Sequence, residues 1–202
     1  AVAHTPPCHS ERAGGVARVV RLRSLGVHVG LGTDGQASNN DQDMFEEMRL
    51  AAFLPKGTMG DPTLLPARDV FAMATIEGAR AVHLDHLIGS LEVGKRADLT
   101  VVDMKAPHLN PRYQLSPAHI YSHLVYAAKA SDVCHVMVDG QWLLRDGQYL
   151  TIDVPLVIEK ATEFAARINT FISQREQSLL DKLLAVNDPA LSPIHISQPT
   201  HP

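Results

Sequence analysis

The sequence predicts an α/β fold, and three observations carry that prediction. Segments with helical and strand-like spacing alternate over roughly the first 85 residues, which is the rhythm of parallel α/β architecture. Near Leu87 this rhythm gives way to turn-rich sequence with short strands. A long amphipathic segment follows Asp153. We therefore expect four parts, which comprise residues 1–86, 87–150, 151–187 and an unstructured tail at 188–202.

Two short strands are expected near the N-terminus. Residues 1–7 read as the end of one strand followed by a loop, and residues 27–31 form an apolar run that reads as a second, buried strand containing His28. Between them, residues 15–25 have the spacing of an amphipathic helix that stops at Gly26. Further helices are expected over residues 44–53, 66–74 and 75–82.

The second half predicts a small antiparallel sheet and a terminal helix. Residues 99–102 form a four-residue apolar strand, and residues 133–138 and 141–144 form a hairpin around the turn Asp139-Gly140. Residues 117–130 between these strands look helical. Asp153 can cap a helix from Val154 to about Val186. We expect its buried face to comprise Leu156, Ile158, Phe164, Ile168, Phe171 and Ile172.

Composition narrows the classes of function. Hydrophobic residues make up 45% of the 202 residues and charged residues 20%, which is ordinary for a globular protein. The net charge is −4, so a nucleic-acid or anionic membrane partner has no electrostatic support. No apolar run reaches the ~20 residues of a membrane-spanning helix. The two cysteines form no CxxC pair, which favours a reducing, cytoplasmic location.

Asp34 is the strongest candidate for chemistry. It follows the predicted strand at 27–31 inside Gly32-Thr33-Asp34-Gly35, where the glycines permit a tight turn and close approach of a ligand. Side chains at the carboxyl ends of barrel strands point into active sites. A carboxylate there can bind a metal ion, contact substrate or act as a general base. The alternative is an Asp that only bonds its own backbone turn.

The histidines supply no complete metal site. A catalytic zinc needs about three protein ligands, and the chain has no His-x-His pair. His4 ends the first predicted strand and can reach the same site as Asp34, as a ligand or a substrate-side group. His119 and His123 have i, i+4 spacing but lack the acidic residue of an HExxH motif, so we interpret them as structural.

Several motifs in order resemble the amidohydrolase superfamily. Residues 32–40 and 44–49 (GTDGQASNN and MFEEMR) resemble its last barrel strand and the following helix. Residues 88–99 (IGSLEVGKRADL) resemble the segment that leads from the barrel into a small β-sandwich. Residues 123–128 and 136–140 match as well. The similarity is greatest to the branch of 5-methylthioadenosine/S-adenosylhomocysteine deaminases, beside the triazine hydrolases.

This resemblance implies a fold, a cofactor and a reaction. The fold is the C-terminal portion of a metal-dependent (β/α)8 barrel with part of a β-sandwich, and the metal is one divalent ion, usually Zn²⁺. Asp34 is the counterpart of the family's last metal ligand and proton acceptor, and the other ligands lie upstream of Ala1. The implied reaction is hydrolytic deamination of an adenosine-type nucleoside. The resemblance also suggests a homo-oligomer, and we expect the chain alone to be inactive.

Other interpretations stay open. Where the family continues His-x-Pro with Ser-Asn-x-Lys-Leu, this chain has Cys8-His9 in place of Ser-Asn, so the loop beside Asp34 has diverged or reflects a local frameshift. Residues 191–202 resemble translated adapter sequence. A triazine chlorohydrolase or a guanine deaminase would share the Asp34 motif. A non-catalytic scaffold or binding chain would lack the remaining metal ligands.

Overall fold

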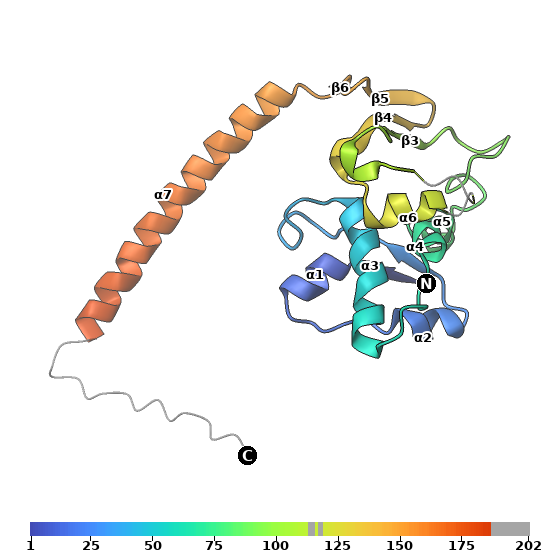
Figure 1. Cartoon of the computed structure of the whole chain (residues 1–202). Coiled ribbons are helices and arrows are strands. Elements are labelled where there is room, and N and C mark those ends of the chain that lie inside the picture. Colours follow the sequence, from blue (N-terminus) through green and yellow to red (C-terminus); the bar gives the residue numbers. More distant parts are fainter. Residues whose placement is uncertain (113–115, 117–118, 187–202) are drawn as a thin grey trace, which may run out of the picture. The chain divides into compact units, whose positions relative to one another are not determined.

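The computed structural model describes residues 1–112, 116 and 119–186, and Figure 1 shows the course of the chain. Its contacts define a compact unit over Ala1–Thr151 and a second unit that begins at Ile152. The finer division at residue 87 remains a prediction. The predicted tail at 188–202 lies outside the described residues.

A parallel pair of strands confirms the two N-terminal strands. β1 (Val2–His4) pairs with β2 (Val29–Leu31), with Val2 opposite Val29 and His4 opposite Leu31. The prediction that His28 is a buried strand residue is wrong. The strand begins one residue later, and the half-exposed His28 ring lies 3.1 Å from the Glu77 carboxylate. That polar partner stabilises the ring at the surface.

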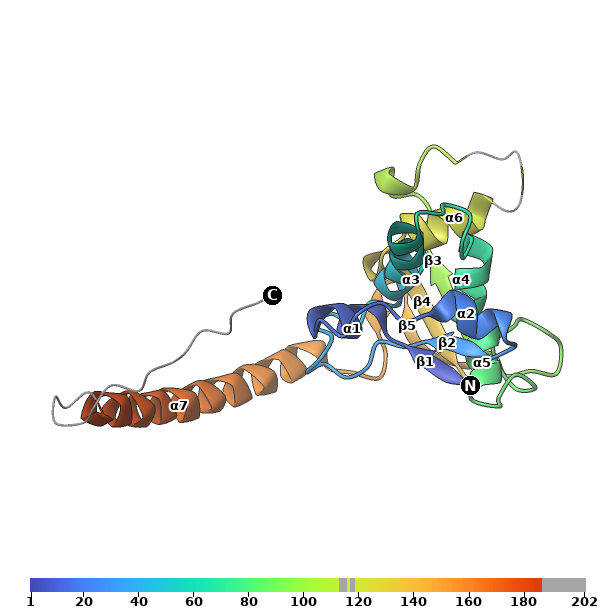
Figure 2. The same ribbon diagram turned by 90° about the horizontal axis from the view of Figure 1, so that it is seen from below.

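Five helices surround this pair, and Figure 2 shows β1 and β2 side by side among them. They are α1 (Pro6–Glu11), α2 (Val19–Ser24), α3 (Met44–Met59), α4 (Ala67–Met73) and α5 (Ile76–Ala81). Helix α5 packs closely on β2. The close approach requires glycine at residue 30, because a Cβ atom there would lie only 2.9 Å from the Gly78 Cα. The core contains Val19, Val29, Met48, Ala51, Ala52, Val70, Met73 and Val125.

Three helix predictions need correction. The segment that forms helix α1 was expected to be a loop. Helix α2 starts at Val19 rather than at Gly15, because Gly15 has φ +81°, which a right-handed helix does not accommodate. Helix α3 continues past residue 53 to Met59, since Pro55 is itself buried and its packing outweighs the lost backbone hydrogen bond. It ends at Gly60, in the left-handed conformation typical of helix ends.

The predicted antiparallel sheet is confirmed, with a fourth strand, residues 148–149, that was not predicted from the sequence. It contains β3 (Leu99–Val102), β4 (Val133–Val138), β5 (Gln141–Arg145) and β6 (Gln148–Tyr149), in that order. The turn between β4 and β5 is Asp139-Gly140, and the Asp139 N–H donates to the Asp98 carboxylate at 2.6 Å. Helix α6 (His119–Tyr126) and the 3-10 turns η1 (Pro107–Leu109) and η2 (Ala130–Asp132) connect β3 to β4. Residues 117 and 118 of the predicted helix lie outside the described residues.

Helix α7 (Val154–Val186) has the predicted bounds and cap, because the Leu156 N–H donates to the Asp153 carboxylate at 3.1 Å. The prediction of its buried face is wrong. All six apolar side chains of that face are exposed, and Phe171 retains 61% of its accessible surface. In the unit that begins at Ile152, α7 is the one helix or strand that the structure describes. No other described element of that unit therefore covers its apolar side. Over residues 1–112 and 119–186, no helix is both long and apolar enough to cross a membrane.

Candidate active site

The carboxyl ends of the two parallel strands bring the predicted site residues to one edge. His4 is the last residue of β1, and its carbonyl accepts a hydrogen bond from the Gly32 N–H at 3.1 Å. Asp34 lies two residues after Gly32, beyond the end of β2. Because adjacent parallel strands end at the same edge, the topology places these residues at one side of the pair.

Three donors orient the Asp34 carboxylate. The Gly35 N–H donates to Oδ1 at 2.8 Å, whereas the Ser38 hydroxyl and the Cys8 thiol donate to Oδ2 at 3.0 Å and 3.2 Å. The backbone of Asp34 has φ +63°, a left-handed conformation that an aspartate adopts more readily than most residues. The alternative prediction, that Asp34 only bonds its own backbone turn, therefore accounts for the Gly35 contact and leaves the Ser38 and Cys8 contacts unexplained.

These hydrogen bonds hold the pKa of Asp34 below its usual value. The Cys8 thiol contributes most, followed by the Gly35 N–H, Ser38 and the charge of Arg12. The side chain is exposed and remains ionised at neutral pH. An ionised carboxylate at a strand end is suited to binding a cation, and its lowered pKa makes it a weak base.

His4, the last residue of β1, is buried, with 3% of its surface exposed. Burial lowers its pKa to about 4, with the nearby His9 as a smaller cause, so the imidazole is neutral at pH 7. The two rings stack with centroids 6.3 Å apart. The His4 Nδ1 atom is buried and has no hydrogen-bond partner. A neutral imidazole is the form that binds metal ions.

Sequence reasoning missed the buried pair that supports the Asp34 loop. The Asn39 amide donates to Glu47 Oε1 at 2.6 Å, and both side chains are buried. One signal was available. Glu47 lies three residues after Met44 and four before Ala51, on the side of α3 that the apolar spacing turns toward the core. A carboxylate at such a position is unusual and points to a specific hydrogen bond.

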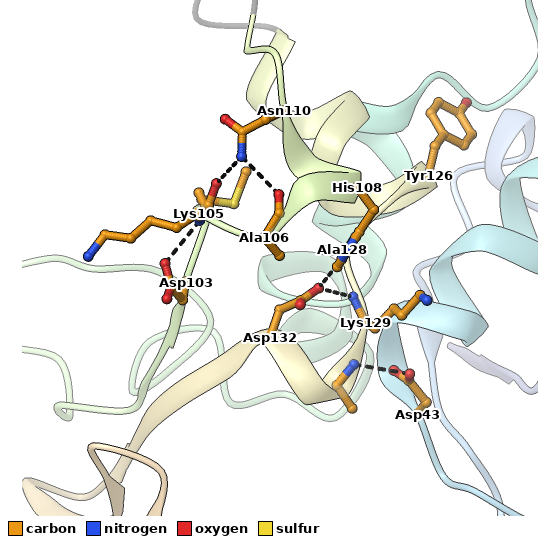
Figure 3. A network of polar contacts seen from close by, with 12 residues as sticks. Asp43, Asp103, Lys105, Ala106, His108, Asn110, Tyr126, Ala128, Lys129 and Asp132 are labelled. Atoms are coloured by element: carbon orange, nitrogen blue, oxygen red, sulfur yellow. Dashed lines mark hydrogen bonds and ion pairs between the residues drawn. The ribbon is translucent and has the colours of Figure 1, made fainter.

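A second polar network anchors the far end of the same loop, as Figure 3 shows. Asp43 caps α3 by accepting from the Phe45 N–H at 2.7 Å, and its other oxygen accepts from the Ala130 N–H at 3.1 Å. Nearby, the Asp132 carboxylate binds His108 Nε2 and the Lys129 N–H, both at 2.9 Å. The loop from residue 34 to residue 43 is thus attached at its end to the segment that enters β4.

Of the two predicted site residues, Asp34 is exposed and open to a metal ion, whereas His4 is buried. No three His, Cys, Asp or Glu side chains among residues 1–112 and 119–186 are arranged to hold a metal ion. His119 and His123 lie on α6, where both are partly buried. Asp34 remains the candidate because its Oδ1 accepts one hydrogen bond from the described residues, which leaves acceptor capacity for a cation.

Comparison with known proteins identifies the family. The model of the amidohydrolase family matches residues 2–143, which include both strand ends, the Asp34 loop and most of the antiparallel sheet. The chain belongs to the amidohydrolase family. Within this family, the parallel pair and its helices correspond to part of an α/β fold, as the motifs predicted.

The amidohydrolases most similar to the chain include nucleoside deaminases. A 5-methylthioadenosine/S-adenosylhomocysteine deaminase of Desulforudis audaxviator is 49% identical over 168 residues, which are 83% of this chain and 38% of that protein. A 5'-deoxyadenosine deaminase of Methanosarcina acetivorans is 46% identical, with coverage of 83% and 38%. A zinc-bound adenosine deaminase from Xanthomonas campestris superposes with a TM-score of 0.78 at 37% identity, over 83% of this chain and 37% of that one. The chain therefore spans little more than a third of these relatives.

Proposed function

We propose that this chain supplies the last strand-end carboxylate of a zinc-dependent deaminase that acts on 5'-modified adenosine nucleosides. The observation that carries this proposal is the Asp34 carboxylate, which is ionised, exposed and oriented by three donors at the carboxyl end of β2. The relatives that share 46–49% of its residues are named as deaminases of such nucleosides. The remaining zinc ligands would lie in the region that corresponds to the part of those relatives that this chain does not cover.

The donor set of this chain fits one position of such a metal site. Oδ2 of Asp34 accepts two hydrogen bonds and Oδ1 accepts one, so Oδ1 is the atom with room for a cation. When bound, a zinc ion would lower the pKa of a water molecule and make it nucleophilic at neutral pH. Asp34 would then accept a proton from the nucleophile through its carboxylate, while His4 at the end of β1 stays neutral.

The test uses the complete polypeptide that carries these residues, purified with zinc. Ammonia release is measured with 5'-methylthioadenosine, S-adenosylhomocysteine and 5'-deoxyadenosine, and guanine serves as a competing substrate class. Chloride release from a chlorotriazine is measured in parallel. We expect turnover with at least one of the adenosine nucleosides. Turnover with guanine or the chlorotriazine alone would replace the proposed substrate class, and absence of turnover with all of them would favour a binding chain.

Asp34→Asn tests the role of the carboxylate. Removing its charge should lower kcat by about 10²–10⁴-fold, the range expected for a group that transfers a proton, and should lower the zinc content. Asp61→Asn is the matched control, because Asp61 also has a pKa lowered by hydrogen bonds, from Thr63, but lies outside the site. Unchanged turnover and zinc content in Asp34→Asn would remove Asp34 from the mechanism.

A further inference from the structure

Glu47 is a buried carboxyl group for which the reaction has no direct use. Its side chain has no exposed surface, Oε1 accepts from Asn39 at 2.6 Å, and Oε2 has no hydrogen-bond partner. An ionised carboxylate with an unpaired buried oxygen would be strongly disfavoured. Burial accordingly raises the pKa of Glu47 to about 8, with Glu46 and Asp41 adding repulsion and the Asn39 bond opposing the shift. Glu47 is therefore a neutral acid at pH 7.

Asn39, the hydrogen-bond partner of Glu47, lies at the centre of the loop that runs from residue 34 to residue 43. The Asn39 side chain is 1% exposed, and its Oδ1 accepts from the Gln42 N–H at 2.9 Å. Gln42 Nε2 in turn donates to the Asp34 carbonyl at 3.2 Å. Ser38, adjacent to Asn39 in the chain, donates to Asp34 Oδ2. Fixing Asn39 thus fixes two groups that hold Asp34, one at its backbone and one at its carboxylate.

The backbone of the loop explains why such an anchor is needed. Asp34 has φ +63° and Gln42 has φ +51°, so two residues other than glycine occupy the left-handed region. Such conformations persist only where the surrounding structure determines them. The exposed hydrogen bonds of Gln42 and Ser38 compete with water, whereas the Asn39–Glu47 bond is buried. The buried pair is therefore the part of the loop that solvent does not weaken.

We infer that Glu47 is a positioning residue, which acts as a neutral acid through Asn39 to hold Asp34 in place. This inference rests on the proposed role of Asp34. Around Glu47, the charged groups that affect it are Asp41 on the loop and Glu46 on α3. Of the helices packed on α3, α1 carries His9 and Glu11, α4 carries Arg68 and Asp69, and α6 carries His119 and His123. The ionised carboxylate would be a better acceptor for Asn39, but its charge would fall on a buried group whose Oε2 has no partner, so hydration of that charge favours opening of the loop.

The first experiment compares variants of the zinc-loaded complete polypeptide. Glu47→Gln keeps the acceptor oxygen without a charge, so kcat should stay within about threefold of the unmodified protein. Glu47→Leu and Asn39→Ala remove the bond and should lower kcat about 10–100-fold with little change in KM, because misplacement of a reacting group by about 1 Å has effects of that size. Asn40→Ala is the matched control, since Asn40 is the exposed neighbour of Asn39. A Glu47→Gln variant as impaired as Glu47→Leu would overturn the inference.

The second experiment needs neither activity nor a destabilised variant. Hydrogen exchange protection of amides 35–43 is measured at pH 6 and pH 9, after correction for intrinsic rates, in the unmodified protein and in Glu47→Gln. Protection should fall at least tenfold at pH 9 in the unmodified protein and should persist in Glu47→Gln. Equal protection in both proteins at pH 9 would overturn the inference. Because this measurement does not involve turnover, it separates failure of the positioning role from failure of the proposed deaminase function.

Discussion

Helices α3 and α7 begin in the same way and differ in everything that follows. Each has an aspartate immediately before its first residue. The Asp43 carboxylate accepts from the Phe45 N–H at 2.7 Å, and the Asp153 carboxylate accepts from the Leu156 N–H at 3.1 Å. Both helices were predicted from their amphipathic spacing, and for α7 the Asp153 cap was predicted as well. Helix α3 buries its inward side, including Glu47, whereas α7 leaves Phe164 and Phe171 exposed.

The difference shows what an amphipathic pattern does and does not specify. The pattern predicts that a helix forms and which side is apolar, because both depend on neighbours within two turns. Burial depends on a partner that lies elsewhere in the chain or in another chain. For α3 that partner consists of α4 and α6, which contribute Val70 and Val125 to the common core. Four predictions test whether the two helices differ energetically as their surroundings indicate.

The largest difference is expected for a charge placed on each helix. Ala52 in α3 has no exposed surface, so Ala52→Asp buries an unpaired carboxylate and should cost at least about 4 kcal/mol of unfolding free energy. Ala165 in α7 is exposed, and Ala165→Asp should change that free energy by less than about 0.5 kcal/mol. Denaturant titration of the complete polypeptide measures both. A large loss in Ala165→Asp would contradict the contrast.

The second prediction concerns pH. The pKa of Glu47 is raised from 4.5 to about 8, so between these values the native state binds a proton that the unfolded chain does not. Stability from this group is complete below pH 4.5 and is lost as the pH rises to 8. Glu47→Gln removes this dependence. From pH 5 to pH 8, the unfolding free energy of the unmodified protein should fall by roughly 4 kcal/mol more than that of Glu47→Gln.

The matched control for this pH dependence is Glu163→Gln, on the exposed surface of α7. An exposed substitution of this kind should shift the unfolding free energy by less than about 0.5 kcal/mol at either pH. If Glu47→Gln and Glu163→Gln behave alike across the range, Glu47 is not a buried neutral acid.

The third prediction compares the loss of apolar side chains. Met48 is 4% exposed, and Met48→Ala should cost about 3 kcal/mol through lost burial and the cavity left behind. Phe164 is 58% exposed and stacks with the Arg167 guanidinium, 5.2 Å from the ring centroid. Phe164→Ala should cost about 0.5 kcal/mol. A cost above about 2 kcal/mol in the complete polypeptide would show that a partner covers the apolar side of α7.

The parts of the fold that were predicted correctly depend on short-range signals. The strand at 99–102, the hairpin around Asp139-Gly140 and the start of α7 each follow from a few adjacent residues. One error arose because distant packing overrides local preference. Pro55 normally ends a helix, but its burial against the core carries α3 on to Met59. The error at Pro6-Pro7 has a local cause, because the pair reads as a loop although proline is tolerated at a helix start and α1 begins there.

The features of the candidate site also divide into those with a local signal in the sequence and those that depend on distant residues. The prediction of Asp34 as a site residue rests on a local signal, a glycine-rich turn that comes shortly after a strand. The thiol that contributes most to its lowered pKa comes from Cys8, which is 26 residues earlier in the chain. That contact depends on the parallel pairing of β1 with β2, which the spacing of residues does not reveal. The Asn39–Glu47 pair was within reach of prediction, since both residues belong to the motif that follows Asp34.

The smallest difference is expected for the two caps. Asp153→Ala removes one hydrogen bond and should cost about 0.5–1 kcal/mol, the usual range for an exposed N-cap. Asp43→Ala should cost more, about 1–2 kcal/mol, because its second oxygen also binds the Ala130 N–H and so joins α3 to the segment before β4. Hydrogen exchange adds a local readout, since Asp153→Ala should speed exchange in the first turn of α7 alone. Asp43→Ala should speed exchange both in the first turn of α3 and at Ala130. If the two variants cost the same and Ala130 stays protected, the bond between Asp43 and Ala130 contributes no stability, and the two helix starts are equivalent after all.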